Sequence, residues 1–98
     1  MDMQNLMRQA QKMQQEMTKS QKEIEAKIFE SKIAMVTVVM KGTKEVEKIE
    51  IDREFKIEAD DYEMMEDSIM AAVNDCLKKI SKETEEKMGK FGNMPGLF

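Results

Sequence analysis

The first 41 residues of this 98-residue chain contain neither glycine nor proline, the two residues that most often interrupt a helix. Apolar or small side chains recur there at alternating steps of three and four residues, which places them in one stripe along a helix. The pattern predicts a helix over roughly residues 3–28, about 40 Å long. So long a helix in so small a domain is expected to project or to pair with another helix. Its apolar stripe consists of Met3, Leu6, Ala10, Met13, Met17, Ser20 and Ile24.

The spacing of apolar residues changes after this helix. Seven of the eight residues from Ile33 to Met40 are apolar, and β-branched side chains cluster towards the end of the run. Such a run is typical of a strand that is covered on both faces. The next four residues, Lys41–Lys44, read "KGTK" and contain the first glycine of the chain, which predicts a hairpin turn.

A second strand is predicted in the segment "EVEKIEID". Ile49 and Ile51 alternate there with charged residues, so one side of this strand should face solvent. Val46 is out of phase with Ile49, which indicates a bulge or a twisted start. The short segment Phe55–Ile57 either forms a third strand or closes the following loop.

Helical spacing returns over residues 60–88. Asp60 and Glu63 fit a capping box, and acidic side chains crowd the first turns, where the helix dipole favours them. Gly89 and Gly92 should end the helix. Its apolar side is predicted to consist of Tyr62, Met65, Ile69, Val73, Cys76, Leu77 and Ile80.

The order of elements predicts an α+β fold, with a long N-terminal helix, a small antiparallel sheet of two to three strands and a long C-terminal helix. The length supports one domain over residues 1–90, followed by a flexible tail over residues 91–98. A domain of this size buries only about 60–65% of its unfolded surface. With four Phe and one Tyr as its only aromatic residues, the chain has a thin core. We therefore expect a second copy to cover part of the apolar surface.

The residues that carry most enzymatic chemistry are missing. The chain has no histidine, Cys76 is its single cysteine, and its four glycines are scattered, which excludes a Cys-based zinc cluster and a Gly-rich phosphate loop. The acidic segment "ADDYEMMED" lacks the ligand spacing of a calcium loop, and a capped helix start explains it. The sequence predicts a protein that is not an enzyme and that uses no cofactor, metal or small-molecule substrate. Cys76 is expected to be buried on the apolar side of its helix.

The sequence contains no targeting signal that would direct the protein out of the cytoplasm. The N-terminus has no continuous apolar segment of the kind found in secretory leaders, and no apolar run approaches the ~18 residues that a membrane span needs. These features predict a cytoplasmic protein without a membrane partner.

Charge is distributed unevenly along the chain. The net charge of −4 is unlike the strongly basic balance of most nucleic-acid binders. Residues 1–22, however, hold four cations against two acids, and residues 76–98 hold five cations against three. Residues 59–75 hold six acids and no cation. The two ends are therefore basic, and the middle is acidic.

These features leave two binding functions open. The Met-rich first helix is either a face that adapts to apolar segments of other proteins or simply the packing surface of the helix itself. The basic side chains of both helices either contact phosphate groups or are only solvated.

Several segments resemble the YbaB/EbfC family of bacterial nucleoid-associated proteins, almost from end to end and in the same order. They are "MQNLMRQAQKMQQEM", "VEKIEID", "AAVNDCLKKISKETEEKMGKF" and the terminal "PGLF". The resemblance implies a homodimer in which strands of both copies form a central sheet and long helices protrude like tweezers. It also implies binding of double-stranded DNA in the nucleoid, with a role in chromosome organisation or gene regulation.

Charge and position then select the residues for such a function. We expect phosphate contacts, which fix position without reading bases, so that sequence specificity is weak or absent. The alternative is a protein-interaction module that uses the Met-rich helix and does not bind DNA. The predicted DNA-binding residues are Arg8, Lys12, Lys19 and Lys22 of the first helix and Lys78, Lys79, Lys82, Lys87 and Lys90 near the end of the second.

Overall fold

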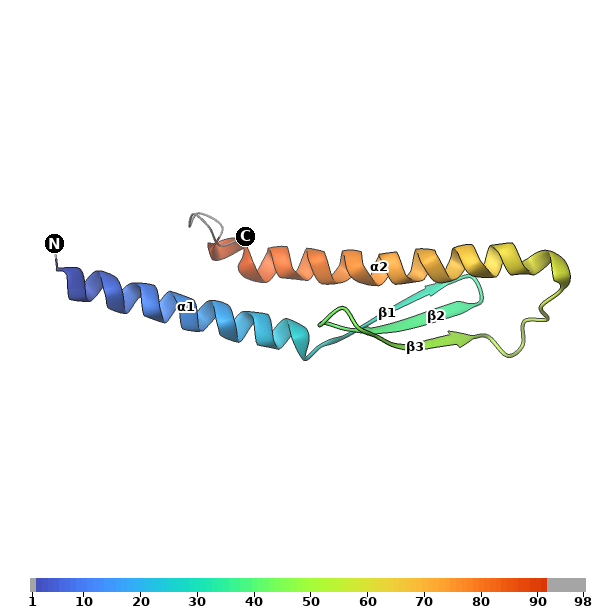
Figure 1. The fold of residues 1–98 in the computed structure, drawn as a ribbon, viewed down its shortest axis with the longest axis horizontal. Helices are drawn as coiled ribbons and strands as arrows, with labels where there is room; N and C mark the ends of the chain where they lie inside the picture. Colours follow the sequence, from blue (N-terminus) through green and yellow to red (C-terminus); the bar gives the residue numbers. More distant parts are fainter. Residues whose placement is uncertain (1, 92–98) are drawn as a thin grey trace.

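A computed structural model describes residues 2–91 of the chain, and its elements follow the predicted order of helix, sheet and helix (Figure 1). The three strands form one antiparallel sheet in the order β1-β2-β3. The predicted α+β class is therefore confirmed. The elements are α1 (Met3–Glu25), β1 (Ile28–Ile33), β2 (Val36–Lys41), β3 (Val46–Ile51), a 3₁₀ turn (Ala59–Asp61), α2 (Tyr62–Met88) and a second 3₁₀ turn (Gly89–Phe91).

The molecule is strongly elongated, with principal dimensions of 71 × 20 × 15 Å. Helix α2 lies along one face of the sheet, whereas α1 leaves the end of the sheet and runs past the C-terminal end of α2 (Figure 1). The N-terminal turns of α1 therefore project away from the rest of the chain, as its predicted length suggested.

The sheet begins earlier than the sequence analysis predicted. Residues 28–33 form β1, although the helix was expected to continue to residue 28, and the run from Ile33 to Met40 was expected to be one strand. Instead, Ile33 pairs with Val36 across a two-residue turn, in which Ala34 adopts a φ of 51°. This turn carries no glycine or asparagine, the residues that normally favour positive φ, so no local pattern in the sequence indicated it.

Helix α1 ends at Glu25 rather than near residue 28. The N–H of Ala26 closes the last turn by bonding to the carbonyl of Lys22 at 3.0 Å. Two residues after the end of the helix, the carbonyl of Lys27 accepts a hydrogen bond from the N–H of Gly42 at 2.9 Å. This contact with the β2–β3 turn draws the chain away from the helix axis and into the sheet.

The second hairpin agrees with the predictions. Lys41–Lys44 form the turn, with the N–H of Lys44 bonded to the carbonyl of Lys41 at 2.8 Å. The register shifts between Val39 and Met40, which pair with Lys48 and Val46, so the predicted bulge is confirmed. Phe55–Ile57 forms no strand and closes the loop, where the N–H of Phe55 bonds to the carbonyl of Asp52 at 3.1 Å.

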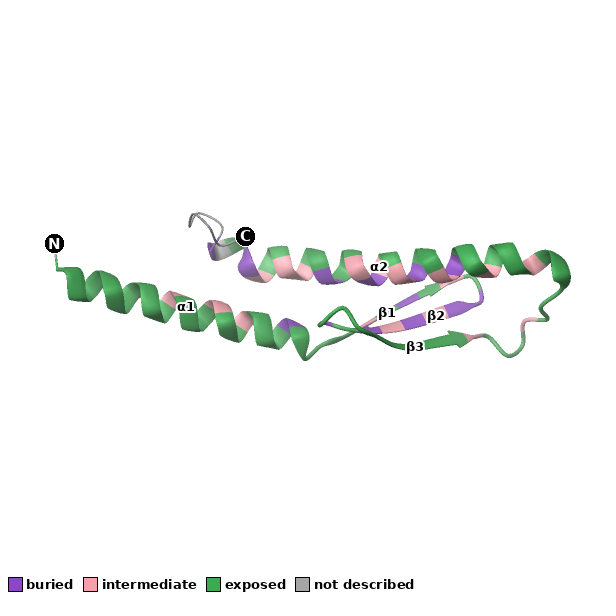
Figure 2. Ribbon diagram, in the orientation of Figure 1, coloured by how far each residue is buried: buried purple, intermediate pink, exposed green. Residues whose placement is uncertain are grey.

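The core lies between α2 and the face of the sheet that it covers (Figure 2). Small side chains at Ala72 and Cys76 let α2 approach the sheet closely, and the predicted burial of Cys76 is confirmed. On the opposite face, Thr37 and Val39 remain partly exposed, so β2 is not covered on both faces within one chain as predicted. The buried residues of this core are Ile24, Met35, Val36, Val38, Met40, Ala72, Cys76 and Ile80.

The start of α2 also differs from the prediction. A 3₁₀ turn precedes the helix, and the capping box uses Glu58 and Asp61 instead of Asp60 and Glu63. The N–H of Glu58 bonds to Oδ2 of Asp61 at 2.9 Å. Tyr62, predicted on the apolar side of the helix, is exposed because the first turn of α2 extends past the end of the sheet (Figure 1).

Gly42 is required by close packing. An added Cβ would lie 1.7 Å from the carbonyl oxygen of Ile24, a backbone atom that cannot move without shifting the end of α1. Gly42→Ala is therefore expected to lower the free energy of unfolding by at least ~2 kcal/mol, measured by urea denaturation.

Gly89→Ala is the matched control for this experiment. Nothing lies within 4 Å of the added Cβ, and Gly89 has helical φ and ψ of −60° and −32°. This substitution should leave the stability unchanged or raise it by about 0.5 kcal/mol. Equal losses in the two variants would contradict the role of the close contact.

Candidate nucleic-acid interface

The basic residues of α1 share one side of the helix. At 3.6 residues per turn, Arg8, Lys12, Lys19 and Lys22 fall within an arc of about 80°, nearly opposite the apolar stripe. All four side chains are exposed. We call these four residues the cationic face of α1.

Only the C-terminal end of α1 is anchored to the rest of the chain. Ile24 is 1% exposed and belongs to the core. Two ion pairs connect the same region to α2: Glu23 with Lys87 at 3.4 Å, and Lys27, just after α1, with Glu83. At the other end, Asp2 caps the helix by accepting a hydrogen bond from the N–H of Gln4 at 3.0 Å.

The apolar stripe becomes more exposed towards the N-terminus (Figure 2). Ile24 is buried, Met17 and Met13 are partly buried, and Leu6 and Met3 are 45% and 74% exposed. Met7, which widens the stripe, is 61% exposed. The packing surface expected from the sequence is therefore used only near the sheet, and its outer half has no partner in the described residues of one chain.

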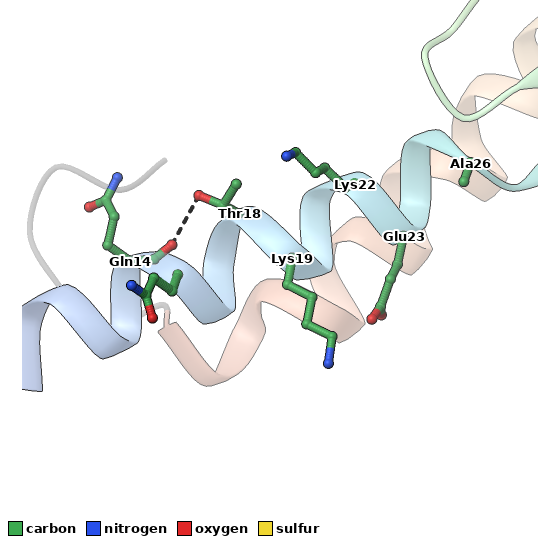
Figure 3. A pocket seen from close by; sticks show the side chains of 7 residues that line it. Gln14, Thr18, Lys19, Lys22, Glu23 and Ala26 are labelled. Atoms are coloured by element: carbon green, nitrogen blue, oxygen red, sulfur yellow. Dashed lines mark hydrogen bonds between the residues drawn. The ribbon is translucent and has the colours of Figure 1, made fainter.

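The cationic face has Glu23 at its edge, but that carboxylate is paired with Lys87 of α2. Residues 2–91 supply no ion-pair partner for any of its four side chains. Figure 3 shows a shallow depression along this side of α1, with Lys22 and Thr18 on one flank and Lys19 and Glu23 on the other. Helix α2 passes behind and below α1 in this view, and its Lys87 pairs with Glu23 at the edge of the depression.

The lysines of α2 have different surroundings from those of α1. Lys79 donates a hydrogen bond to the carbonyl of Glu30 at 2.7 Å and lies 3.3 Å from Asp75. Lys87 is paired with Glu23. These two ammonium groups therefore hold α2 against β1 and α1, and a phosphate would have to compete with their present partners.

The remaining candidates in this part of the chain are less constrained. Lys78 and Lys82 are exposed and have no ion-pair partner among residues 2–91. Lys82 lines a shallow depression together with Phe29, Lys79, Glu83 and Glu86, so two acidic groups and one other cation lie near it. Lys90 lies in the second 3₁₀ turn, and its side chain is outside the described part of the structure.

The acidic segment lies far from the cationic face. Residues 59–75 form the first 3₁₀ turn and the N-terminal half of α2, at the end of the molecule opposite the N-terminus of α1 (Figure 1). The net charge of −4 is thus not spread evenly but separated along the long axis. A basic surface on α1 is compatible with an acidic chain.

A polar cluster that the sequence did not reveal connects α2 to β1. The buried Ser31 donates a hydrogen bond to Oδ2 of Asp75 at 2.6 Å, and Lys79 approaches the same oxygen. The Ser31 hydroxyl, followed by Lys79, holds the pKa of Asp75 below its usual value of 3.8. The partners are separated by 44 residues in the chain, so no local pattern could have indicated the cluster.

Other kinds of site find little support in residues 2–91. These residues contain no group of three acidic or cysteine side chains placed to hold a metal ion. Neither helix in this range is long and apolar enough to cross a membrane.

Comparison with known proteins shows what the chain is similar to. The model of the YbaB/EbfC DNA-binding family matches residues 1–94. A protein of Ligilactobacillus salivarius named "Nucleoid-associated protein" is 43% identical over 99 residues, covering 99% of this chain and 95% of the relative. A nucleoid-associated protein of Clostridium botulinum is 47% identical over 98 residues, covering 97% and 86%.

A solved structure supports the fold. The crystal structure of an uncharacterized protein from Helicobacter pylori matches with a TM-score of 0.76, covering 95% of this chain and 99% of the other. The two sequences are 24% identical, so this similarity concerns the fold alone.

The Ser31–Asp75 contact predicts a pH dependence of stability. Since the folded state lowers the pKa of Asp75, the carboxylate stabilises the fold above pH 3.8, and this contribution is lost as the pH falls through the lower folded value. Asp75→Asn should be less stable than the wild type at neutral pH, and the difference should shrink below about pH 4. Urea denaturation over a pH series measures it.

Ser31→Ala provides the comparison, because it removes the donor with the largest effect on the pKa. The difference in free energy of unfolding between Ser31→Ala and the wild type should become smaller over the same acidic range. A small difference should remain at low pH because the variant lacks the hydroxyl group. If the loss of unfolding free energy in Asp75→Asn stays constant from neutral pH to below pH 3.8, the contact with Ser31 does not lower the pKa of Asp75.

Proposed function

This chain belongs to the YbaB/EbfC DNA-binding family, and from that premise we propose that the cationic face of α1 binds the phosphates of double-stranded DNA. The observation that carries the proposal is the exposure of four basic side chains on one side of a projecting helix, without acidic partners among residues 2–91. Arg8 and Lys22 are 14 residues apart, or about 21 Å along the helix axis. That length spans roughly six base pairs.

The lysines of α2 have a supporting role in this proposal. Lys78 and Lys82 are exposed and available for phosphate contacts in the C-terminal half of α2. Lys79 and Lys87 would first have to leave Asp75 and Glu23. Binding should therefore depend more on α1 than on α2.

Contacts of this kind hold DNA without requiring a particular sequence. Phosphate groups are the same at every base pair, so specificity should be weak. A dissociation constant in the range of about 10⁻⁴–10⁻⁶ M at physiological salt is typical of such binding. The function that follows is association with the nucleoid and a contribution to chromosome organisation or gene regulation, without catalysis.

A homodimer is the proposed binding unit. β3 lies at an edge of the sheet, and α2 does not cover it, so that Val46 and Ile49 are 44% and 47% exposed. Apolar side chains on an uncovered edge strand favour association with another sheet. Two copies would present two cationic faces to one duplex. Once one face is bound, the other is held close to the same duplex, and this high effective concentration strengthens binding.

A second candidate function rests on the uncovered apolar stripe. Met3, Leu6 and Met7 are exposed in the single chain, and methionine side chains adapt to varied apolar partners. This surface suits a protein-interaction module that binds an apolar segment of another protein. Such binding would depend little on salt, in contrast to binding of phosphate.

Reversing charge on the cationic face should abolish most DNA binding. We expect Arg8→Glu/Lys12→Glu to lower affinity for a labelled duplex at least tenfold in fluorescence anisotropy, because two attractive contacts become repulsive. If the wild-type dimer neutralises about six phosphates, log K should fall with log salt at a slope near −5. The variant should show a shallower slope.

The matched control is Arg53→Glu/Lys56→Glu. It reverses one arginine and one lysine, both exposed in the loop before α2, at the far end of the molecule from the N-terminus of α1 (Figure 1). This control should bind DNA within about twofold of the wild type. Equal losses in the two variants would show that net charge matters rather than the cationic face, and a wild-type slope shallower than about −2 would contradict the phosphate contacts.

The dimer makes a separate prediction. Sedimentation equilibrium should give the wild type a mass of about twice the 11.4 kDa of one chain. Ile49→Asp should shift it towards the monomer, because a charge would be buried at the edge of the sheet. Lys48→Asp, on the opposite face of the same strand, should remain dimeric. A monomeric wild type, or a dimeric Ile49→Asp variant, would exclude this interface.

A further inference from the structure

The side of α1 that carries the cationic face also carries a line of glutamines. At 3.6 residues per turn, Gln15 falls within the arc of the basic residues, and Gln11 lies about 20° beyond the edge of the arc that Lys22 marks. Both are exposed, and no residue in the range 2–91 hydrogen-bonds to their amides. The exposed side of α1 thus combines two chemistries, ammonium or guanidinium groups and free primary amides.

The two chemistries occupy different parts of this side. Gln15 lies near the centre of the arc, and Gln11 lies one turn earlier. Lys19 lies on one flank and Lys22 on the other, as Figure 3 shows. A cation on either side of a central amide matches a groove with phosphates along both walls and base edges on its floor.

The major groove of B-form DNA fits this arrangement. It is about 12 Å wide, and an α-helix with side chains is roughly 10–12 Å across. Gln11 and Gln15 are about 6 Å apart along the helix axis, close to the rise of two base-pair steps. A glutamine amide there can donate to N7 and accept from the N6 amino group of adenine, which gives a bidentate contact.

The rest of the chain leaves this side free. The apolar stripe lies on the opposite side of α1, and the Glu23–Lys87 ion pair with α2 borders the basic side only near the C-terminal end of the helix. The N-terminal turns extend beyond α2, so a duplex can approach them without meeting the sheet of the same chain (Figure 1).

We propose that α1 binds in the major groove, with Gln11 and Gln15 directed at adenine edges and the flanking lysines on phosphates. The inference rests on the proposed DNA binding and goes beyond it, because it assigns two residues to base reading. It also defines the expected specificity: weak overall, but in favour of sites that present adenines two base pairs apart.

The test uses the full chain and two duplexes of identical sequence, rich in adenine and about 20 base pairs long, roughly three times the length of the face. In one duplex 7-deazaadenine replaces adenine, which removes the N7 acceptor but keeps base pairing. Fluorescence anisotropy at one low salt concentration should show about three- to tenfold tighter binding to the unmodified duplex. Gln11→Ala/Gln15→Ala should bind both duplexes equally, and no more tightly than the wild type binds the modified one.

Gln9→Ala/Gln14→Ala is the matched control. It removes two exposed glutamines that lie roughly 110° to either side of the centre of the arc. The control should keep the wild-type preference for the unmodified duplex. Loss of the preference in this control would overturn the assignment to Gln11 and Gln15.

Two other outcomes separate this inference from the proposed function. Equal binding of both duplexes by the wild type, with affinity still dependent on Arg8 and Lys12, would overturn base reading and leave phosphate binding intact. Absence of binding to either duplex at low salt would overturn both.

Discussion

Helix α2 packs against β1 and β2, and this contact positions the other elements of the fold. Ala72, Cys76 and Ile80 are at most 1% exposed, and they contact a sheet face that is built on Val36, Val38 and Met40. Ala72 and Cys76, one helical turn apart, bring the helix axis close to the sheet, and the aromatic side chains Phe29 and Phe55 pack only at the margin of this thin two-layer core. This core has no room for most of α1. Only Ile24 enters it, and the close approach of Gly42 to the last turn of α1 fixes where the helix leaves the sheet.

The projecting helix and the separation of charge follow from that arrangement. A chain 71 Å long places its cationic and acidic regions several Debye lengths apart, since screening acts over about 10 Å at 0.1 M salt. The acidic start of α2 therefore has little influence on the field around Arg8 and Lys12. In α2, by contrast, Lys79 and Lys87 are already paired with Asp75 and Glu23. Each exposed ion pair contributes at most about 1 kcal/mol, so Lys87 and Glu23 orient α1 more than they stabilise it.

Much of the fold was predictable because helices and bulges leave local signals in a sequence. Both long helices, the turn at Lys41–Lys44, the bulge near Val46 and the burial of Cys76 agree with the predictions. Strand β1 was missed because Ile28, Phe29 and Ile33 follow a strong helical pattern without a glycine or proline between them. The turn at Ala34 and Met35 is apolar, and it forms because the pairing of β1 with β2 outweighs the local cost of a positive φ.

The period of a helix places the apolar stripe of α1 on one side and Arg8, Lys12, Lys19 and Lys22 on the other, so both helices and these two sides follow from the order of residues alone. How much of the stripe is buried, and which basic groups are already paired, follows only from the folded chain. Those outcomes depend on partners far apart in the chain, such as Lys27 with Glu83 and Ser31 with Asp75. A residue's spacing fixes its side of a helix, whereas its burial and its free charge depend on what the fold places against it.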